Sequence, residues 1–181
     1  MKKGTKSLLW GVHQVFIHPV IVWLAWIKVN KSVPSWKEVI CIIIHDWGYW
    51  GCENMDDEKG ERHTEWAADI ALFRLDSVEL YYLCLFHSRH YARKHGAPPS
   101  KLCWADKYSI TYEPWWLYLP RAWASGELKE YRQEAADAGF LPLSATHREW
   151  FAWVSERLAM LGREKRGDCT PYVNPVRIIE P

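Results

Sequence analysis

The sequence has little of several features that often settle a protein's chemistry. Its five cysteines are an odd number and form no Cys-x-x-Cys pair, so they indicate reduced thiols rather than a disulfide framework. It has no Gly-rich phosphate loop, no Gly-x-Ser-x-Gly elbow and no internal repeat. Nucleophilic serine catalysis is therefore unsupported, and the reduced thiols favour a cytoplasmic location.

The sequence also has no large excess of charge of one sign. The 23 basic and 22 acidic residues leave a net charge of +1, so we expect no specific binding of nucleic acid. Positive charge is nevertheless concentrated around His87 and Asp106. The residues concerned are Arg89, Arg93, Lys94, Lys101 and Lys107. Such a group is usually a solvated helix face; the alternative is a rim that binds the phosphate oxygens of a small phosphorylated substrate.

Only the stretch from Ser7 to Val29 is long and apolar enough to raise the question of a membrane span. His13, Gln14 and His18 interrupt it with polar side chains. We therefore predict a helix buried in the core and no membrane span. A shallow surface anchor remains the alternative, because the chain has 13 tryptophans and tryptophan favours membrane interfaces.

The periodicity of the apolar residues predicts an all-α protein, with no strand alternation of useful length. About half of the residues are apolar, which suits a single compact domain over residues 1–162 with seven to eight helices. Ser35 and Ser144 are the predicted N-caps of two of these helices. Pro171, Pro175 and Pro181 discourage a helix in residues 163–181, which we expect to form an extended tail that packs on the domain or takes part in homo-oligomerisation.

What the sequence does contain is a set of histidines and aspartates where apolar segments end. The doublet His45-Asp46 follows the run Val39 to Ile44, His87 follows Leu80 to Phe86, and Asp106 follows Leu102 to Ala105. A lone histidine is more often a hydrogen-bonded core residue than a ligand. Several histidines and aspartates at such junctions, however, predict that these residues lie together on the floor of one pocket. Imidazole nitrogens and carboxylate oxygens suit zinc, iron, manganese or nickel, so the sequence predicts a metal centre.

In these residues the chain resembles the HD superfamily of metal-dependent phosphohydrolases over roughly residues 8–112. The matching residues are His18, His45-Asp46, His63, His87 and Asp106, the last within Ala-Asp-Lys. Their order is most similar to the two-metal branches, such as the diadenosine tetraphosphate hydrolase type. No Gly-Tyr-Pro motif follows His87, so a cyclic dinucleotide substrate is not supported, and Trp47 to Trp50 stand where many members have a phosphate-facing lysine.

The resemblance implies an HD-domain-like helical bundle, a centre of one or two divalent ions and hydrolysis of a nucleotide or other small phosphoester. The ion itself stays open among manganese, iron, zinc, nickel, cobalt and magnesium. Asp46 would bridge two ions, with His18, His45 and Asp106 on one and His63 and His87 on the other. Arg89, Arg93 and Lys107 would bind phosphate, and His90 would protonate the leaving group. His90 also competes with His87 as a ligand, and His13 competes with His18.

Two other functions fit the same residues. Some relatives with this ligand set are di-iron oxygenases, which cleave a carbon bond with dioxygen. The other is a non-catalytic interaction domain, stabilised by metal, that binds a partner through a tryptophan-rich surface. That surface would contain Trp115, Trp116, Trp123 and Trp150.

Overall fold

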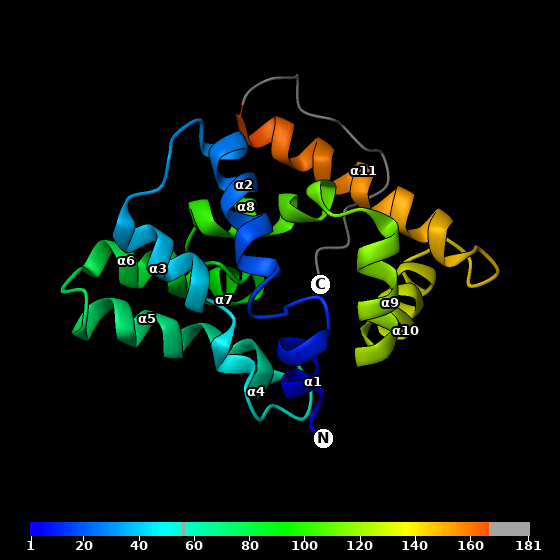
Figure 1. The fold of residues 1–181 in the computed structure, drawn as a ribbon, viewed down its shortest axis with the longest axis horizontal. Coiled ribbons are helices and arrows are strands. Elements are labelled where there is room, and N and C mark those ends of the chain that lie inside the picture. Colours follow the sequence, from blue (N-terminus) through cyan, green and yellow to red (C-terminus); the bar gives the residue numbers. More distant parts are fainter. Residues whose placement is uncertain (56, 167–181) are drawn as a thin grey trace.

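The computed structural model describes residues 1–55 and 57–166, and in this part of the chain every regular element is a helix (Figure 1). The predicted all-α class is confirmed. The α-helices are α1 (Lys3–Trp10), α2 (His18–Asn30), α3 (Trp36–Ile44), α4 (Glu58–Glu61), α5 (His63–Phe73), α6 (Val78–Leu85), α7 (Arg89–Lys94), α8 (Lys101–Ser109), α9 (Trp115–Ser125), α10 (Glu127–Asp137) and α11 (His147–Arg166). Two 3₁₀ turns, η1 (Trp47–Tyr49) and η2 (Ile110–Tyr112), follow α3 and α8. The α-helices outnumber the seven to eight expected because two predicted long helices are divided and the short helix α4 precedes α5.

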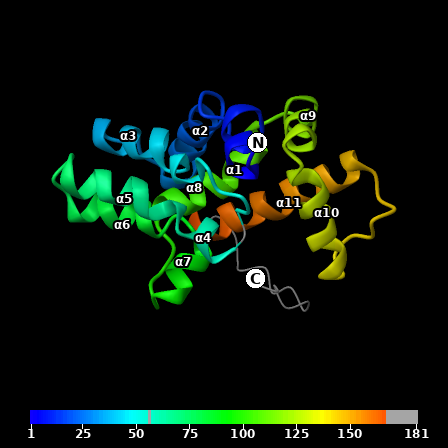
Figure 2. The same ribbon diagram turned by 90° about the horizontal axis from the view of Figure 1, so that it is seen from below.

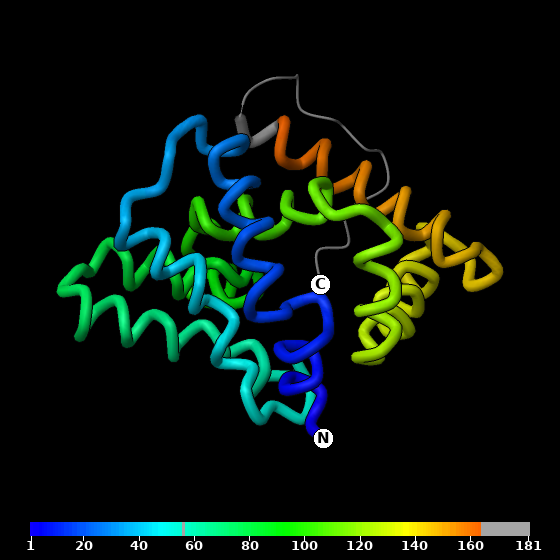
Figure 3. Tube along the Cα trace, viewed as in Figure 1, coloured from blue at the N-terminus to red at the C-terminus, as the bar shows by residue number. Residues whose placement is uncertain are grey.

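The first division falls within residues 7–29. The prediction of one helix there is wrong, because α1 ends at Trp10 and α2 begins at His18. Gly11 lies so close to Glu127 that a Cβ atom would approach its carboxylate to 2.5 Å, and Pro19 favours a helix start because it lacks an amide hydrogen. The chain therefore turns between the two helices (Figure 3).

The second division falls within residues 77–94, where the apolar periodicity predicts one helix and the structure has α6 and α7. Ser88 accepts a hydrogen bond from the Tyr91 amide and so begins α7, which leaves His87 in the turn before it. A histidine in a turn is not restricted to a helix face.

Helix capping follows the sequence in most places. Ser35 and Glu38 form the expected capping box. The predicted cap at Ser144 is wrong. Thr146 takes this place instead, because its hydroxyl accepts from the Glu149 amide at 3.2 Å and its own amide donates to the Glu149 carboxylate at 2.7 Å.

Two apolar clusters form the core. The first joins α2, α3, α5, α6 and α8 through residues such as Trp26, Ile42 and Leu102, all at most 1% exposed. The second joins α9, α10 and α11 around Tyr118 and Trp150. Helix α11 packs on α2, α8 and α9 and so contacts both clusters, as the two orthogonal views show (Figures 1 and 2).

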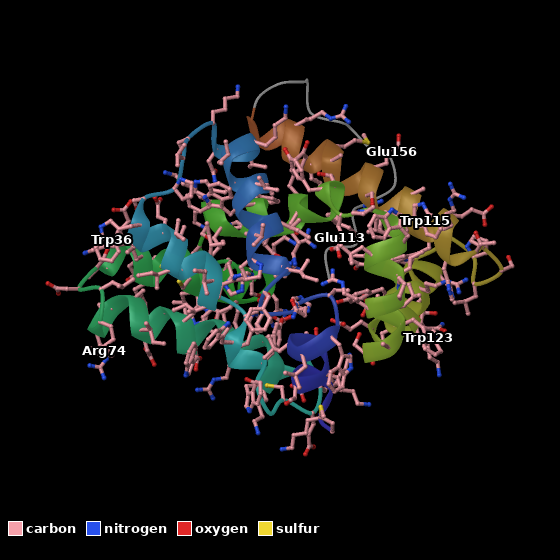
Figure 4. All side chains as sticks on the ribbon, in the orientation of Figure 1. Trp36, Arg74, Glu113, Trp115, Trp123 and Glu156 are labelled. Atoms are coloured by element: carbon pink, nitrogen blue, oxygen red, sulfur yellow. The ribbon has the colours of Figure 1, made fainter. Side chains whose placement is uncertain are left out.

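The tryptophans do not form one surface. Trp150 is 3% exposed and lies in the second cluster, so its prediction as part of a partner-binding surface is wrong. Trp115, Trp116 and Trp123 are exposed on α9, and Figure 4 shows Trp115 and Trp123 along this helix, with Glu113 nearer the centre of the molecule.

None of the helices in the described ranges has the length and apolar character needed to cross a bilayer. Helix α11 continues to Arg166, past the predicted domain end at residue 162. The rest of the predicted tail, residues 167–181, lies outside the described residues.

Candidate metal centre

Six of the predicted ligands come from five different segments. His18 begins α2, His45 and Asp46 lie between α3 and η1, and His63 begins α5. His87 lies between α6 and α7, and Asp106 is inside α8, which packs against α2. Most of these side chains thus project from helix ends, where their direction is not tied to a helix face.

Three of the four histidines are held by their own backbone. The Nδ1 atoms of His45, His63 and His87 lie 2.7, 2.7 and 2.6 Å from the carbonyl oxygens of the residues three positions earlier. A carbonyl oxygen only accepts, so each Nδ1 carries the hydrogen and donates it. Each neutral ring then presents its Nε2 as a lone pair, which is how metal-binding histidines are usually oriented.

These Nε2 atoms converge on Asp46. Its Oδ2 lies 3.0 Å from His45 Nε2 and 3.3 Å from His18 Nε2. Its Oδ1 lies 3.5 Å from His87 Nε2 and 3.9 Å from His63 Nε2. Asp46 thus lies between two pairs of histidines, with one carboxylate oxygen toward each pair.

Asp106 completes the set from the side of α8. Its Oδ1 lies 3.1 Å from His18 Nε2 and 4.0 Å from His45 Nε2. Two groups of potential ligand atoms result, each within 4.8 Å of one another: His18, His45 and Asp106 form one, and His45, Asp46 and His87 form the other.

Two imidazole nitrogens of the cluster lie in direct contact, because the Nε2 atoms of His63 and His87 are 3.1 Å apart. Both Nδ1 hydrogens are already donated to carbonyls, so two neutral rings would bring two lone pairs together in the protein interior. Only a proton or another cation between them relieves this repulsion.

Other polar atoms of the cluster lack hydrogen bonds. His18 Nε2, His45 Nε2 and Asp46 Oδ2 are buried and have no partner in hydrogen-bonding geometry, although they lie close to one another. A buried polar atom without a partner costs about 1–3 kcal/mol. Ligation of a cation satisfies such atoms, and this mixed nitrogen and oxygen set fits a divalent transition metal.

Both carboxyl groups of the cluster have lowered pKa values. Burial works against the charge of Asp46, but His45, His13 and His18 hold its pKa well below the usual value. Burial also opposes the charge of Asp106, and Lys107 and His18 keep the pKa of Asp106 low.

The histidines differ from one another. Burial opposes protonation of His18, yet its contacts with Asp106 and Asp46 raise its pKa to about 9. For His63, burial and the neighbouring His87 lower the pKa well below the usual value. Two carboxylates and a neutral His63 favour binding of a cation, whereas His18 must lose its proton before its Nε2 can bind a metal ion.

The predicted phosphate-binding residues lie at different distances from this cluster. Lys107 Nζ is 3.1 Å from Asp106 Oδ2, and its side chain is 37% exposed. Asp106 raises the pKa of Lys107 and the charge of Arg89 opposes the rise, so Arg89 lies within electrostatic reach. Arg93 and His90 are exposed on α7.

The segment between the doublet and His63 packs against both. A Cβ on Gly48 would lie 2.0 Å from the His63 carbonyl oxygen, so only glycine allows this approach. Tyr49 stacks on the His63 ring with centroids 3.8 Å apart and an interplanar angle of 17°. Together these residues fix the His63 ring from the doublet side.

Sequence reasoning missed Tyr49 and Glu127. Glu127 is fully buried at the start of α10, and its carboxylate is 3.0 Å from Nδ1 of His13, whose ring lies 5.5 Å from that of His18. The interruption of an apolar stretch by His13 was the available signal. Nothing nearby in the sequence pointed to Glu127, which lies 114 positions further along.

In comparisons with known proteins, the chain matched no family model, no curated protein and no solved structure.

Proposed function

We propose that this protein is a divalent-metal-dependent phosphohydrolase that acts on a nucleotide or another small phosphoester. The observation that carries the metal centre is the convergence of four Nε2 atoms and two carboxylates, including the His63 and His87 Nε2 atoms 3.1 Å apart. The order of these residues along the chain, which resembles the HD superfamily, supports the assignment to hydrolysis.

His18, His45 and Asp106 would hold one ion, and His63 and His87 would hold a second, with Asp46 between them. Asp46 suits a bridging role because its two oxygens face different pairs of histidines. When bound, such ions lower the pKa of a water molecule to about 7 and stabilise both oxygens of an in-line displacement at phosphorus.

Lys107 supports a phosphate substrate. Its ammonium group lies beside Asp106 and is partly exposed, so it can reach a phosphate oxygen without leaving the edge of the centre. Arg89 adds positive charge within electrostatic reach of Lys107. Arg93 binds phosphate and His90 protonates the leaving oxygen only if a substrate extends along α7.

The first experiment is a metal and substrate screen on the purified chain. The protein is treated with chelator, reloaded in turn with Mn²⁺, Fe²⁺, Zn²⁺, Ni²⁺, Co²⁺ and Mg²⁺, and assayed against nucleoside mono- and triphosphates, dinucleoside polyphosphates and bis(p-nitrophenyl) phosphate. We expect turnover with at least one ion and none after chelation. Metal binding without turnover of any phosphoester would contradict the proposed function.

The variant Asp46→Ala should lose bound metal and turnover while it remains folded. A matched control is Asp69→Ala, because Asp69 is an exposed aspartate on α5, the helix that His63 begins. Equal loss in both variants would mean that the effect is not specific to the centre.

A further inference from the structure

The Glu127 carboxylate lies buried beside the turn that separates α1 from α2. It accepts hydrogen bonds from Ser7 Oγ at 2.7 Å, His13 Nδ1 at 3.0 Å and the Val12 amide at 3.1 Å. Ser125 Oγ donates as well. Burial alone would raise the pKa of Glu127, but its bonds with His13, Ser125 and Ser7 lower the pKa to about 2. Glu127 is therefore ionised at neutral pH.

An ionised carboxylate fixes the tautomer of His13. The carboxylate can only accept, so the hydrogen in the 3.0 Å contact belongs to His13 Nδ1. The nearby Ser7 hydroxyl donates to Glu127, which leaves its oxygen as a second acceptor 2.8 Å from the same nitrogen. In the neutral ring Nε2 therefore carries a lone pair, and it has no hydrogen-bond partner among the described residues.

The His13 ring borders the candidate metal centre. Its centroid is 5.5 Å from that of His18 and 5.4 Å from that of Tyr49, which itself stacks on His63. The His13 side chain is 16% exposed, more than any of the six candidate ligands, so solvent reaches it. Because Nδ1 faces Glu127, Nε2 lies on the ring edge turned away from that anchor.

We propose that His13 is a further catalytic residue of this centre and that Glu127 is its positioning residue. Nε2 of His13 accepts a hydrogen bond from the water that attacks phosphorus. This bond occupies one hydrogen of the water and so directs an oxygen lone pair toward the substrate. As that oxygen bonds to phosphorus, the bond from phosphorus to the leaving oxygen breaks, and the proton that the water loses ends on the leaving oxygen. The role rests on the proposed function, since it needs a hydrolytic water.

Two amide variants separate this role from a structural one. In His13→Asn the side-chain NH₂ takes roughly the place of Nδ1, so the bond to Glu127 is kept and the Nε2 acceptor is lost. In His13→Gln the amide reaches roughly the position of Nε2. Activity is measured with bis(p-nitrophenyl) phosphate and Mn²⁺, together with bound metal and melting temperature.

We expect His13→Asn to fold and bind metal as the parent does, with kcat lowered on the order of 100-fold and KM little changed. His13→Gln should recover part of kcat. If His13 only ties the turn to α10, the order reverses and His13→Asn matches the parent, which overturns the inference.

A second readout does not depend on activity. In ¹⁵N-histidine NMR spectra of the full chain at pH 8, His13 should appear as the Nδ1–H tautomer, and Glu127→Gln should convert it to a mixture of tautomers. An Nε2–H tautomer in the parent overturns the inference. If the parent hydrolyses no phosphoester at all, the proposed function fails. If it is active but His13→Asn is equally active, the inference alone fails.

Discussion

The Nε2 atoms of His63 and His87 lie 3.1 Å apart, although both rings donate their Nδ1 hydrogens to backbone carbonyls. Without a cation between them, this pair opposes folding. We therefore expect added Zn²⁺ or Mn²⁺ to stabilise the chain by about 3 kcal/mol at an ion concentration about 100 times the dissociation constant. Thermal unfolding with and without chelator measures the effect as a rise in melting temperature of roughly 5–10 °C.

The variant His87→Ala tests whether the rise in melting temperature comes from metal bound at this centre. It should lose most of the metal-dependent rise, whereas His95→Ala, at an exposed histidine that ends α7, should keep it. A melting temperature that does not respond to any of the six ions would show that the imidazoles do not form a metal site.

Tyr49 should contribute to metal affinity through the His63 ring. Replacement by Ala removes the stack and about 1 kcal/mol of ring contact, so Tyr49→Ala is expected to bind metal less tightly. Tyr49→Phe keeps the aromatic face and should bind nearly as the parent does. Isothermal titration calorimetry compares the three proteins. Equal affinities in all of them would mean that the stack does not hold the ring in place.

Glu127 predicts a pH dependence of stability. Its folded-state pKa of about 2 lies below the ordinary value of 4.5, so the ionised form stabilises the fold fully above about pH 4.5. That stabilisation, about 3 kcal/mol, is lost as the pH falls from 4.5 through 2. Urea unfolding of the parent and of Glu127→Gln between pH 2 and 7 isolates this contribution. The difference between the two should shrink toward low pH, and a constant difference would contradict the assignment.

The cap of α11 gives a test of local structure. Thr146→Ala should destabilise the protein by about 1 kcal/mol, because the amide of Glu149 loses its hydrogen-bond acceptor. Ser144→Ala removes a hydroxyl of the same kind two residues earlier and should change stability by less than about 0.5 kcal/mol. Urea unfolding at neutral pH decides between them, and the reverse order of effects would place the cap at Ser144.

The helical class could be predicted from the sequence because periodicity and caps such as Ser35 are local signals. The break after Trp10 could not, since Gly11, where α1 ends, packs against Glu127, which lies more than 100 positions away. Similarly, the predicted ligands His45-Asp46, His87 and Asp106 lie at the ends of local apolar runs, whereas the pairing of His13 with Glu127 depends on how α10 packs against the turn before α2. Long-range packing decided what local patterns left open.

The di-iron oxygenase alternative is separated from hydrolysis by electron paramagnetic resonance. We expect the iron-loaded, aerobically purified protein to show no mixed-valence signal that responds to an organic substrate, and its phosphoester turnover to persist with redox-inactive Zn²⁺ or Mg²⁺. A substrate-responsive mixed-valence signal, with turnover confined to iron and dioxygen, would favour the oxygenase.

The most direct test of the metal centre is X-ray absorption spectroscopy of the Zn²⁺-loaded chain. The convergent imidazoles and carboxylates predict a shell of nitrogen and oxygen ligands at about 2.0–2.1 Å with the multiple scattering of several histidines, and this signal should disappear in Asp46→Ala. A sulfur shell at about 2.3 Å, or a spectrum of hydrated Zn²⁺ without histidine scattering, would contradict the account.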